Sequence, residues 1–277
     1  MTVPDRYAVI GHPVAHSWSP FIHQRFAQQS GQHIEYTRID AAPAGFAQAV
    51  QTFFTDGGRG LNVTVPHKQA AARLAHELTP RASRAGAVNT LMMRADGSLL
   101  GDNTDGAGLA RDLLNNHHVR IAGRRVLLLG AGGAARGVLA PLLGLKPSLL
   151  VIANRTEQRA QELARAFSDL GRLGATGYSG LGTQSHDIVI NATAASLAGE
   201  LPPLPPTIVT QQSFCYDMAY ARDDTPFVRW AYERGCARAV MGLGMLVEQA
   251  AESFHLWRGV RPDTPSVLAQ LKAQLSG

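Results

Sequence analysis

The chain has 277 residues and a formal net charge of +5, and 45% of its residues are hydrophobic. This length allows one large domain or two modest ones, with ample material for a buried core. The positive charges form no run of Lys or Arg interleaved with aromatic residues, so nothing supports a nucleic-acid-binding surface, and small anionic ligands explain the surplus equally well.

Neither secretion nor membrane insertion is expected. Arg6 is followed by no long apolar segment, which argues against a signal peptide, and the longest apolar region is interrupted by Arg136 and Lys146. Cys215 and Cys236 match no metal-binding spacing. We therefore predict no metal site, and we expect two buried, reduced thiols in a cytoplasmic protein.

Strands and helices alternate from the start of the chain, and the first helix begins beside two serines. A strand is predicted over residues 7–10, and Ser19 followed by Pro20 indicates a helix with the serine as N-cap. Ser17 and Ser19 alternate in an extended segment, so they could also direct two hydroxyls at one ligand carboxylate. The serines alone do not decide this. A second strand is predicted over 34–40 and a second helix over 46–54.

A polar strand face precedes a lysine in the next segment. The strand predicted over residues 61–65 places Asn62 and Thr64 on one face. Lys68 then begins a helix predicted to run to about residue 78. Because the helix dipole disfavours a lysine at this end, the arrangement favours a ligand site at the carboxyl edge of a sheet.

A hairpin and a dense polar stretch follow. Residues 85–93 and 98–101 are predicted to pair around the turn at Asp96-Gly97. Residues 102–106 are mostly polar and precede a helix predicted over 109–114. From the residues alone, Thr104 is interpreted as a helix cap, with Asp105 complementing the helix dipole.

Residues 126–137, with the sequence Val-Leu-Leu-Leu-Gly-Ala-Gly-Gly-Ala-Ala-Arg-Gly, predict a dinucleotide site. The apolar run suits the centre of a parallel sheet. Gly130 permits a tight turn, Gly132 lets the backbone approach a phosphate, and Ala135 replaces the third glycine of the fingerprint. A plain glycine turn is the alternative, but a helix and a second strand over 149–153 follow at the right intervals.

The end of that second strand favours NADP over NAD. An NAD site usually has Asp or Glu there, to bind the ribose 2′-hydroxyl. This chain has Asn154-Arg155-Thr156, with Arg159 one turn into the next helix. Two guanidinium groups can bind a 2′-phosphate, and Thr156 can at the same time cap a helix predicted over 157–167.

The alternation continues to the end of the chain, which predicts an α/β fold. Further strands are expected over 187–193, 214–220 and 239–240, helices over 227–234, from 242 and over 266–275, and a proline-rich surface loop over 201–206.

Taken together in order and spacing, the motifs resemble those of shikimate dehydrogenases, over essentially the whole chain. The matching stretches are 7–13, 16–20, 62–68, 86–90, 101–106, the turn at Gly130, 154–156, 191–193, 216–218 and 242–246. The resemblance implies two α/β domains with a cleft between them. Residues 1–102 with 245–277 would form a substrate-binding catalytic domain, and residues 103–244 a Rossmann-like NADP-binding domain.

The resemblance also implies reversible NADPH-dependent reduction of 3-dehydroshikimate to shikimate, in the pathway to chorismate and aromatic amino acids. Lys68 and Asp105 would be catalytic. Shikimate would be bound by Ser17, Ser19, Thr64, Asn89, Asp105 and Gln249. NADP would be bound by Gly130, Ala131, Gly132, Gly133, Ala134, Asn154, Arg155, Thr156, Arg159, Met218, Tyr220 and Gly242. No nucleic-acid or membrane partner is implied, and a homodimer stays open.

Some positions depart from the family pattern. Trp18 stands between the serines where lysine is frequent, and His67 replaces an apolar aromatic residue before Lys68. We expect His67 to be a surface imidazole, with tuning of Lys68 as the alternative. Residues 193–195 lack the usual Ser-Gly or Thr-Gly, which leaves the cofactor contacts there undefined.

Three other functions are weighed against this one. A quinate/shikimate dehydrogenase preferring NAD would have an acid at position 154 or 155 and Thr in place of Ser19. A methylenetetrahydrofolate dehydrogenase is disfavoured because Ser17, Ser19 and Asp105 suit a small polyol acid. An NADP-sensing regulator without catalysis would be expected to have lost Lys68 or Asp105, and both are present.

Overall fold

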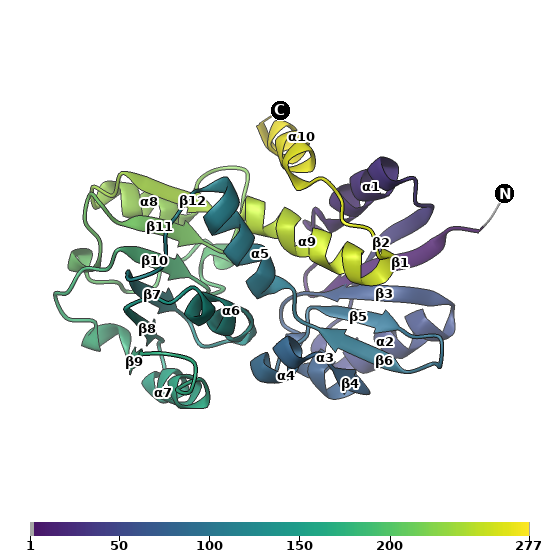
Figure 1. Ribbon diagram of the computed structural model, residues 1–277, viewed down its shortest axis with the longest axis horizontal. Coiled ribbons are helices and arrows are strands. Elements are labelled where there is room, and N and C mark those ends of the chain that lie inside the picture. Colours follow the sequence, from purple (N-terminus) through teal and green to yellow (C-terminus); the bar gives the residue numbers. More distant parts are fainter. Residues whose placement is uncertain (1–2, 277) are drawn as a thin grey trace. The chain divides into compact units, whose positions relative to one another are not determined.

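The computed structural model describes residues 3–276. It divides into two compact units: unit 1 comprises Met1–Gly108 and Leu246–Gly277, and unit 2 comprises Leu109–Met245. Unit 1 is therefore assembled from two segments far apart in the sequence, whereas unit 2 is continuous. The division after Gly108, and not after Asp102, places Asp105 in unit 1. Each unit contains a six-stranded sheet (Figure 1).

The sheet of unit 1 is mixed, with strand order β2-β1-β3-β5-β6-β4. Its strands are β1 (Asp5–Gly11), β2 (Ile34–Asp40), β3 (Gly58–Val63), β4 (Glu77–Leu78), β5 (Thr90–Met93) and β6 (Leu99–Asp102). Its helices are α1 (Ser19–Ser30), η1 (Pro43–Gly45), α2 (Phe46–Thr55), α3 (Lys68–Leu74), α4 (Pro80–Ala85) and α10 (Thr264–Ser276). Helices α5 (Asp105–Arg111) and α9 (Leu243–Arg258) each continue from one unit into the other.

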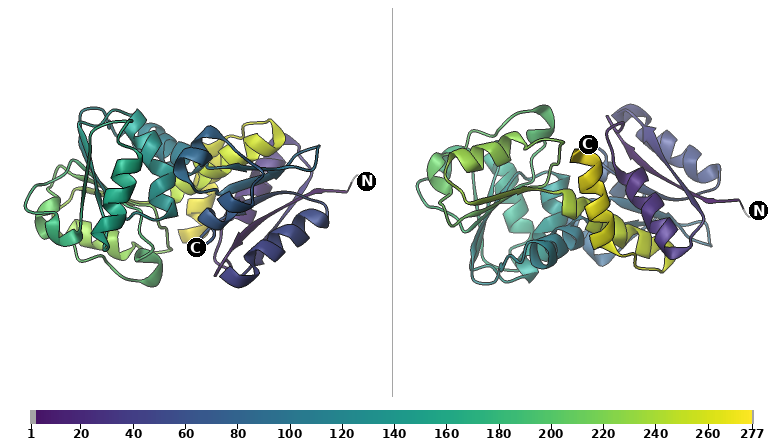
Figure 2. Two further views of the ribbon diagram at one scale, coloured as in Figure 1. Left: turned by 90° about the horizontal axis from the view of Figure 1, so that it is seen from below. Right: turned by 90° about the horizontal axis from the view of Figure 1, so that it is seen from above.

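Alternation along the strands of unit 1 separates two packed faces. Ala8 and Ile10 of β1 belong to a core that includes Phe46 and Val50 of α2. Tyr7 points to the other face, where its ring centroid lies 4.8 Å from that of Trp257 on α9. Helix α10 lies beside α1 (Figure 2), so the two segments of unit 1 pack against each other.

Two local predictions in unit 1 are wrong. Ser19 is not the N-cap of α1: the helix begins at Ser19, Trp18 occupies the cap position, and no side chain caps the helix. The helix that begins at Lys68 ends at Leu74 and not near residue 78. Ala75 takes an extended conformation (φ −67°, ψ 136°), and the chain then pairs with β6 as strand β4. The hairpin of β5 and β6 is confirmed.

The sheet of unit 2 has strand order β12-β11-β10-β7-β8-β9, and each of its pairings among the described residues is parallel. Its strands are β7 (Arg125–Leu129), β8 (Leu149–Ala153), β9 (Leu173–Thr176), β10 (Ile188–Asn191), β11 (Phe214–Asp217) and β12 (Arg238–Met241). Its other helices are α6 (Gly133–Gly144), α7 (Glu157–Ala166), α8 (Pro226–Glu233) and the short turns η2 (Asp112–Asn116), η3 (Tyr178–Gly180), η4 (Ser196–Ala198) and η5 (Pro206–Ile208).

Strand β7 is buried on both faces, as its unbroken apolar run predicts. Val126 and Leu128 pack in one core with Val138 of α6. Leu127 and Leu129 pack in a second core with residues of α8. The cysteines of unit 2, Cys215 and Cys236, are buried free thiols, as predicted.

The helix predicted over 109–114 begins earlier, at Asp105, and continues into the π-helical turn η2. Asp112 in this turn is fully buried, and its Oδ2 accepts a hydrogen bond from the Tyr216 hydroxyl at 2.6 Å. Burial would raise the pKa of Asp112, but hydrogen bonds from His117, Tyr216 and Asn116 outweigh it and hold the pKa below its usual value. Gly244 lies so close that an added Cβ would stand 1.9 Å from Asp112 Oδ1. The widened turn is thus fixed by side-chain contacts that no sequence pattern indicated.

Candidate active site

Lys68 and Asp105 meet at one edge of the sheet of unit 1. Lys68 is the first residue of α3, after β3, and Asp105 is the first residue of α5, after β6. Strands β3 and β6 run in the same direction because each is antiparallel to β5. Lys68 Nζ donates a hydrogen bond to Asp105 Oδ2 at 2.6 Å, and the side chains are 15% and 6% exposed. A protonated amine with an adjacent carboxylate can deliver a proton to a ligand oxygen.

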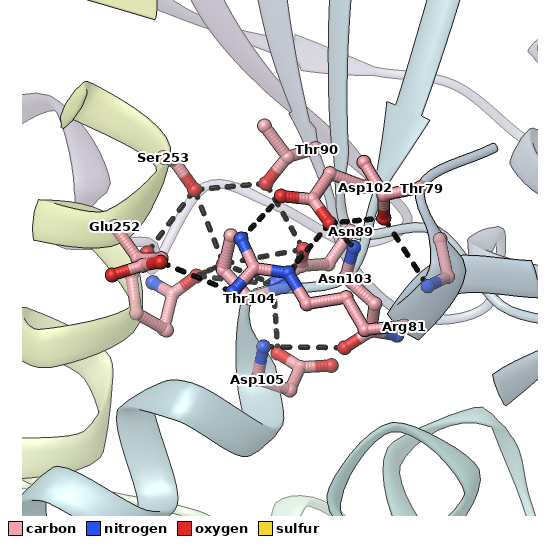
Figure 3. A network of polar contacts seen from close by, with 12 residues as sticks. Thr79, Arg81, Asn89, Thr90, Asp102, Asn103, Thr104, Asp105, Glu252 and Ser253 are labelled. Atoms are coloured by element: carbon pink, nitrogen blue, oxygen red, sulfur yellow. Dashed lines mark hydrogen bonds and ion pairs between the residues drawn. The ribbon is translucent and has the colours of Figure 1, made fainter. Parts of the chain in front are cut away.

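Asn89 and Gln249 extend this pair into a polar group. Asn89 Nδ2 lies 2.9 Å from Asp105 Oδ1, 2.9 Å from Thr104 Oγ1 and 3.2 Å from Gln249 Oε1. Its Oδ1 accepts the backbone N–H of Thr104 at 2.8 Å. Gln249 comes from α9, so both segments of unit 1 contribute to the group. The contacts around Asn89 can be followed in Figure 3.

The two serines form a separate buried pair. Ser17 Oγ donates to Ser19 Oγ at 3.1 Å, and the Arg38 guanidinium donates to the Ser17 carbonyl at 3.0 and 2.6 Å. Thr64 follows β3, and its backbone N–H donates to the Ile10 carbonyl. Within residues 3–276, no hydrogen bond joins the side chains of these three predicted ligands to Lys68 or Asp105. The structure therefore brings together four of the predicted substrate-side residues directly: Lys68, Asn89, Asp105 and Gln249.

Ser253 is a buried contact residue that sequence reasoning missed. Its hydroxyl lies 3.0 Å from Asn62 Nδ2, 2.8 Å from Thr90 Oγ1 and 3.2 Å from Thr104 Oγ1. It follows Gln249 by one helical turn, so the two share a face of α9. That spacing was the available signal.

His67 is not the surface imidazole that we expected. It is 2% exposed, its ring stacks on Phe46 at a centroid distance of 4.3 Å, and its Nε2 lies 2.7 Å from the Ala41 carbonyl oxygen. The ring of Phe46 thus gives the His67 imidazole an apolar neighbour. His67 therefore packs beneath the start of α3.

In unit 2, the predicted glycine turn has the geometry of a phosphate site. Gly130 has φ 106°, which favours glycine, and an added Cβ would lie 3.1 Å from the Ala192 carbonyl oxygen. Gly132 is the N-cap of α6, no side chain caps this helix, and nothing lies within 4 Å of an added Cβ there. The first N–H groups of α6 and the space beside Gly132 therefore fit a pyrophosphate.

Asn154, Arg155 and Thr156 follow β8, and Arg159 lies in the first turn of α7. Thr156 is the N-cap of α7, but the prediction that its side chain caps the helix is wrong, because it makes no capping hydrogen bond. The Thr156 carbonyl instead accepts the Asn154 side-chain amide at 2.9 Å. Arg155 and Arg159 are both exposed, so their guanidinium groups can reach a ligand phosphate.

The remaining predicted cofactor residues lie at the same edge of this sheet. Met218 and Tyr220 follow β11, and Gly242 follows β12. An added Cβ at Gly242 would lie 2.7 Å from the Met218 carbonyl oxygen, so these two segments meet. In parallel α/β sheets, ligands bind at the carboxyl ends of the strands. Among the described residues, no group of three or more His, Cys, Asp or Glu is arranged to hold a metal ion.

Family models match three parts of the chain. The shikimate dehydrogenase substrate-binding domain matches residues 9–91, shikimate/quinate 5-dehydrogenase matches 109–201, and the shikimate 5′-dehydrogenase C-terminal domain matches 242–272. Shikimate dehydrogenase (NADP(+)) of Methylococcus capsulatus is 56% identical over 274 residues, which cover 99% of this chain and 98% of that protein. The chain belongs to the shikimate dehydrogenase family. The resemblance seen in its motifs is thereby confirmed.

Other relatives agree with the family membership. Shikimate dehydrogenase (NADP(+)) of Aeromonas hydrophila is 56% identical over 271 residues, with 98% of each chain covered. The Ael1 enzyme of Pseudomonas putida has a TM-score of 0.88 and 49% identity, covering 96% of this chain and 98% of that one. Shikimate 5-dehydrogenase of Thermus thermophilus, solved with NADP(H) and shikimate, has a TM-score of 0.85 and 32% identity. The match covers 98% of this chain and 99% of that one. The predicted α/β fold of the family is confirmed. Among the described residues, no helix is both long and apolar enough to cross a membrane.

Proposed function

We propose that Lys68 and Asp105 perform the proton transfer in the reaction of this family, the reversible NADPH-dependent reduction of 3-dehydroshikimate to shikimate. The reaction and the cofactor follow from family membership. The residue assignment rests on one observation, the 2.6 Å contact between Lys68 Nζ and Asp105 Oδ2 at the carboxyl edge of the sheet of unit 1. NADPH, when bound, supplies the hydride that reduces the ketone carbon.

The residues of unit 1 are proposed to bind and protonate the substrate. Lys68 stabilises the negative charge that develops on the ketone oxygen and donates the proton, and in the reverse direction it accepts the proton of the alcohol. Asp105 holds the lysine and accepts a hydrogen bond from a ring hydroxyl. Asn89 and Gln249 can each donate and accept, which suits the remaining hydroxyls of a polyol.

The serine pair is proposed to bind the substrate carboxylate. Ser17 and Ser19 are buried with their hydroxyl oxygens 3.1 Å apart, so both can turn toward one anionic group. Thr64, at the end of β3, is proposed to bind the same substrate. Fixing the carboxylate at one end determines which ring oxygen reaches Lys68.

Unit 2 is proposed to bind NADP through the residues predicted from the sequence. The uncapped start of α6 and the open space at Gly132 support binding of the pyrophosphate, and Arg155 with Arg159 supports binding of the 2′-phosphate. Unit 1 is the proposed substrate-binding unit. A cytoplasmic location is also proposed, supported by the buried free thiols. A homodimer stays open.

Replacing Arg155 with alanine should weaken NADP binding about 10–10²-fold and leave NAD binding nearly unchanged, because a charge-assisted hydrogen bond to the 2′-phosphate is lost. Titration of the purified variant with each dinucleotide measures this. Arg165→Ala is the matched control, since it removes an exposed arginine from the last turn of α7, the helix that follows Arg155. Equal weakening of both dinucleotides would place Arg155 away from the phosphate.

The function is tested by following the absorbance of reduced nicotinamide with shikimate or quinate and with NADP or NAD. Rapid reduction of NADP with shikimate, and slow turnover of the other three pairs, is the expected result. Comparable turnover of quinate or preference for NAD would instead assign the chain to the quinate/shikimate type. Binding of NADP with no turnover of any pair would favour a sensor without catalysis.

A further inference from the structure

Asp102 is a buried carboxylate that the proposed reaction does not use. It ends β6 and is 1% exposed. Its Oδ1 accepts hydrogen bonds from Thr79 Oγ1 at 2.6 Å, Arg81 Nε at 2.7 Å and the backbone N–H of Asn103 at 2.7 Å. Its Oδ2 accepts a further one from Arg81 Nη2 (Figure 3). A bidentate guanidinium contact of this kind fixes both the position and the orientation of the carboxylate.

Arg81 links three elements of unit 1. It lies on α4 and contacts Asp102 at the end of β6. Its Nη1 also donates to Glu252 Oε1 of α9 at 3.0 Å, and Glu252 Oε2 accepts a hydrogen bond from Arg261 at 2.8 Å. Helix α9 is also the element that carries Gln249. Arg81 is therefore a connection between the end of β6 and the helix that completes the polar group.

From Asp102, hydrogen bonds continue to two of the proposed site residues. The Asp102 carbonyl accepts the backbone N–H of Asn89 at 3.0 Å. Asn103 Oδ1 accepts the backbone N–H of Asp105 at 3.2 Å, and Asn103 Nδ2 donates to the Ala87 carbonyl at 2.9 Å. The side chains of Asn89 and Asp105 then meet at 2.9 Å. A shift of Asp102 would thus move both partners of that contact.

We propose that Arg81 is a positioning residue: by holding Asp102, it places Asn89 and Asp105 and thereby sets the contact between Lys68 and Asp105. This inference rests on the proposed roles of Lys68 and Asp105. An ion pair that serves folding alone would change the amount of folded protein, whereas a positioning residue changes the turnover of the molecules that are folded. Misplacement of a catalytic group by about 1 Å can cost about 10²-fold in rate.

The test uses Arg81→Ala in the full chain, with rates expressed per folded molecule as judged by circular dichroism. We expect kcat to fall about 10–10²-fold. The affinity for NADP should stay unchanged, because its proposed ligands lie in unit 2. Added guanidinium ions should restore part of kcat by occupying the space beside Asp102. Arg81→Lys should retain an intermediate rate, because it keeps the charge but loses the bidentate contact.

Arg94→Ala is the matched control. Arg94 pairs with Glu77 at 2.6 Å in the same unit but does not contact Asp102. It should show wild-type kcat and no response to guanidinium. A folded Arg81→Ala protein with wild-type kcat would overturn the proposal, and so would a rate loss that neither guanidinium nor lysine restores. If Arg81→Ala does not fold, Arg81→Lys decides: a lowered kcat at unchanged NADP affinity supports the proposal, and wild-type kcat overturns it. Wild-type turnover by Lys68→Ala would contradict the proposed function itself, whatever the Arg81 variants do.

Discussion

Lys68→Ala should lower kcat for shikimate oxidation about 10²–10⁴-fold, the range for a lost general acid–base group, while the KM for shikimate changes little. Lys68 Nζ is proposed to act on charge that appears only as the reaction proceeds, so its removal should reduce kcat and kcat/KM equally. Steady-state rates with saturating NADP, measured in both directions, test this.

Lys272→Ala provides the control for Lys68→Ala. Lys272 is an exposed lysine of α10 in the same unit, and we propose no part for it in the reaction. The Lys272→Ala variant should have the wild-type kcat and the wild-type KM for shikimate. Unchanged turnover in Lys68→Ala would remove Lys68 from the mechanism. A higher KM with kcat retained would make Lys68 a binding residue only.

Asp105→Asn should lower kcat on the order of 10²-fold and, unlike Lys68→Ala, should raise the KM for shikimate. The substitution preserves the size of the side chain but removes the negative charge of the carboxylate. The oxygens of that carboxylate accept hydrogen bonds from Lys68 at 2.6 Å and from Asn89 at 2.9 Å. The KM rises because Asp105 is also proposed to accept a hydrogen bond from a ring hydroxyl of the substrate.

Combining the two substitutions tests whether the residues act as a unit. If Asp105 works through Lys68, the double variant Lys68→Ala with Asp105→Asn should have nearly the kcat of Lys68→Ala alone. Multiplied losses would show that each residue contributes independently. Asp263→Asn, on an exposed loop of unit 1, should leave the rate unchanged.

The parts of the fold that depend on local patterns could be predicted from the sequence. Strand β8 was predicted with the bounds that it has, and the hairpin of β5 and β6 follows from an Asp-Gly turn between apolar runs. The short strand β4 was missed because its pairing with β6 is a tertiary contact that ends α3 early. The π-helical turn η2 depends in part on Tyr216 and Gly244, which contact Asp112 from distant parts of the sequence.

The candidate site divides in the same way. Lys68, Asp105 and Asn89 lie in motifs whose residue types and order are informative, and the structure brings them into contact. Arg81 contacts residues that lie far away in the sequence, so no local pattern indicated it. Ser253 was signalled only by its spacing of one helical turn from Gln249 on α9. Ser19 illustrates the reverse case. Its position before Pro20 favours a helix cap, yet its hydroxyl caps no helix and instead accepts a hydrogen bond from the Ser17 hydroxyl.

The split composition of unit 1 has a consequence for how the enzyme is made. Leu246–Gly277 must join Met1–Gly108 after the whole of Leu109–Met245 has been translated. Gln249 and Ser253 belong to this late segment and contact Asn89 and Thr104 of the early one. Domains generally fold as units during synthesis. The proposed NADP-binding unit, whose chain is continuous, can therefore fold while unit 1 still lacks part of its chain, and the proposed substrate site is completed only when Leu246–Gly277 joins. The proposed substrate-binding group around Asn89 therefore depends on the last segment of the chain to be synthesised.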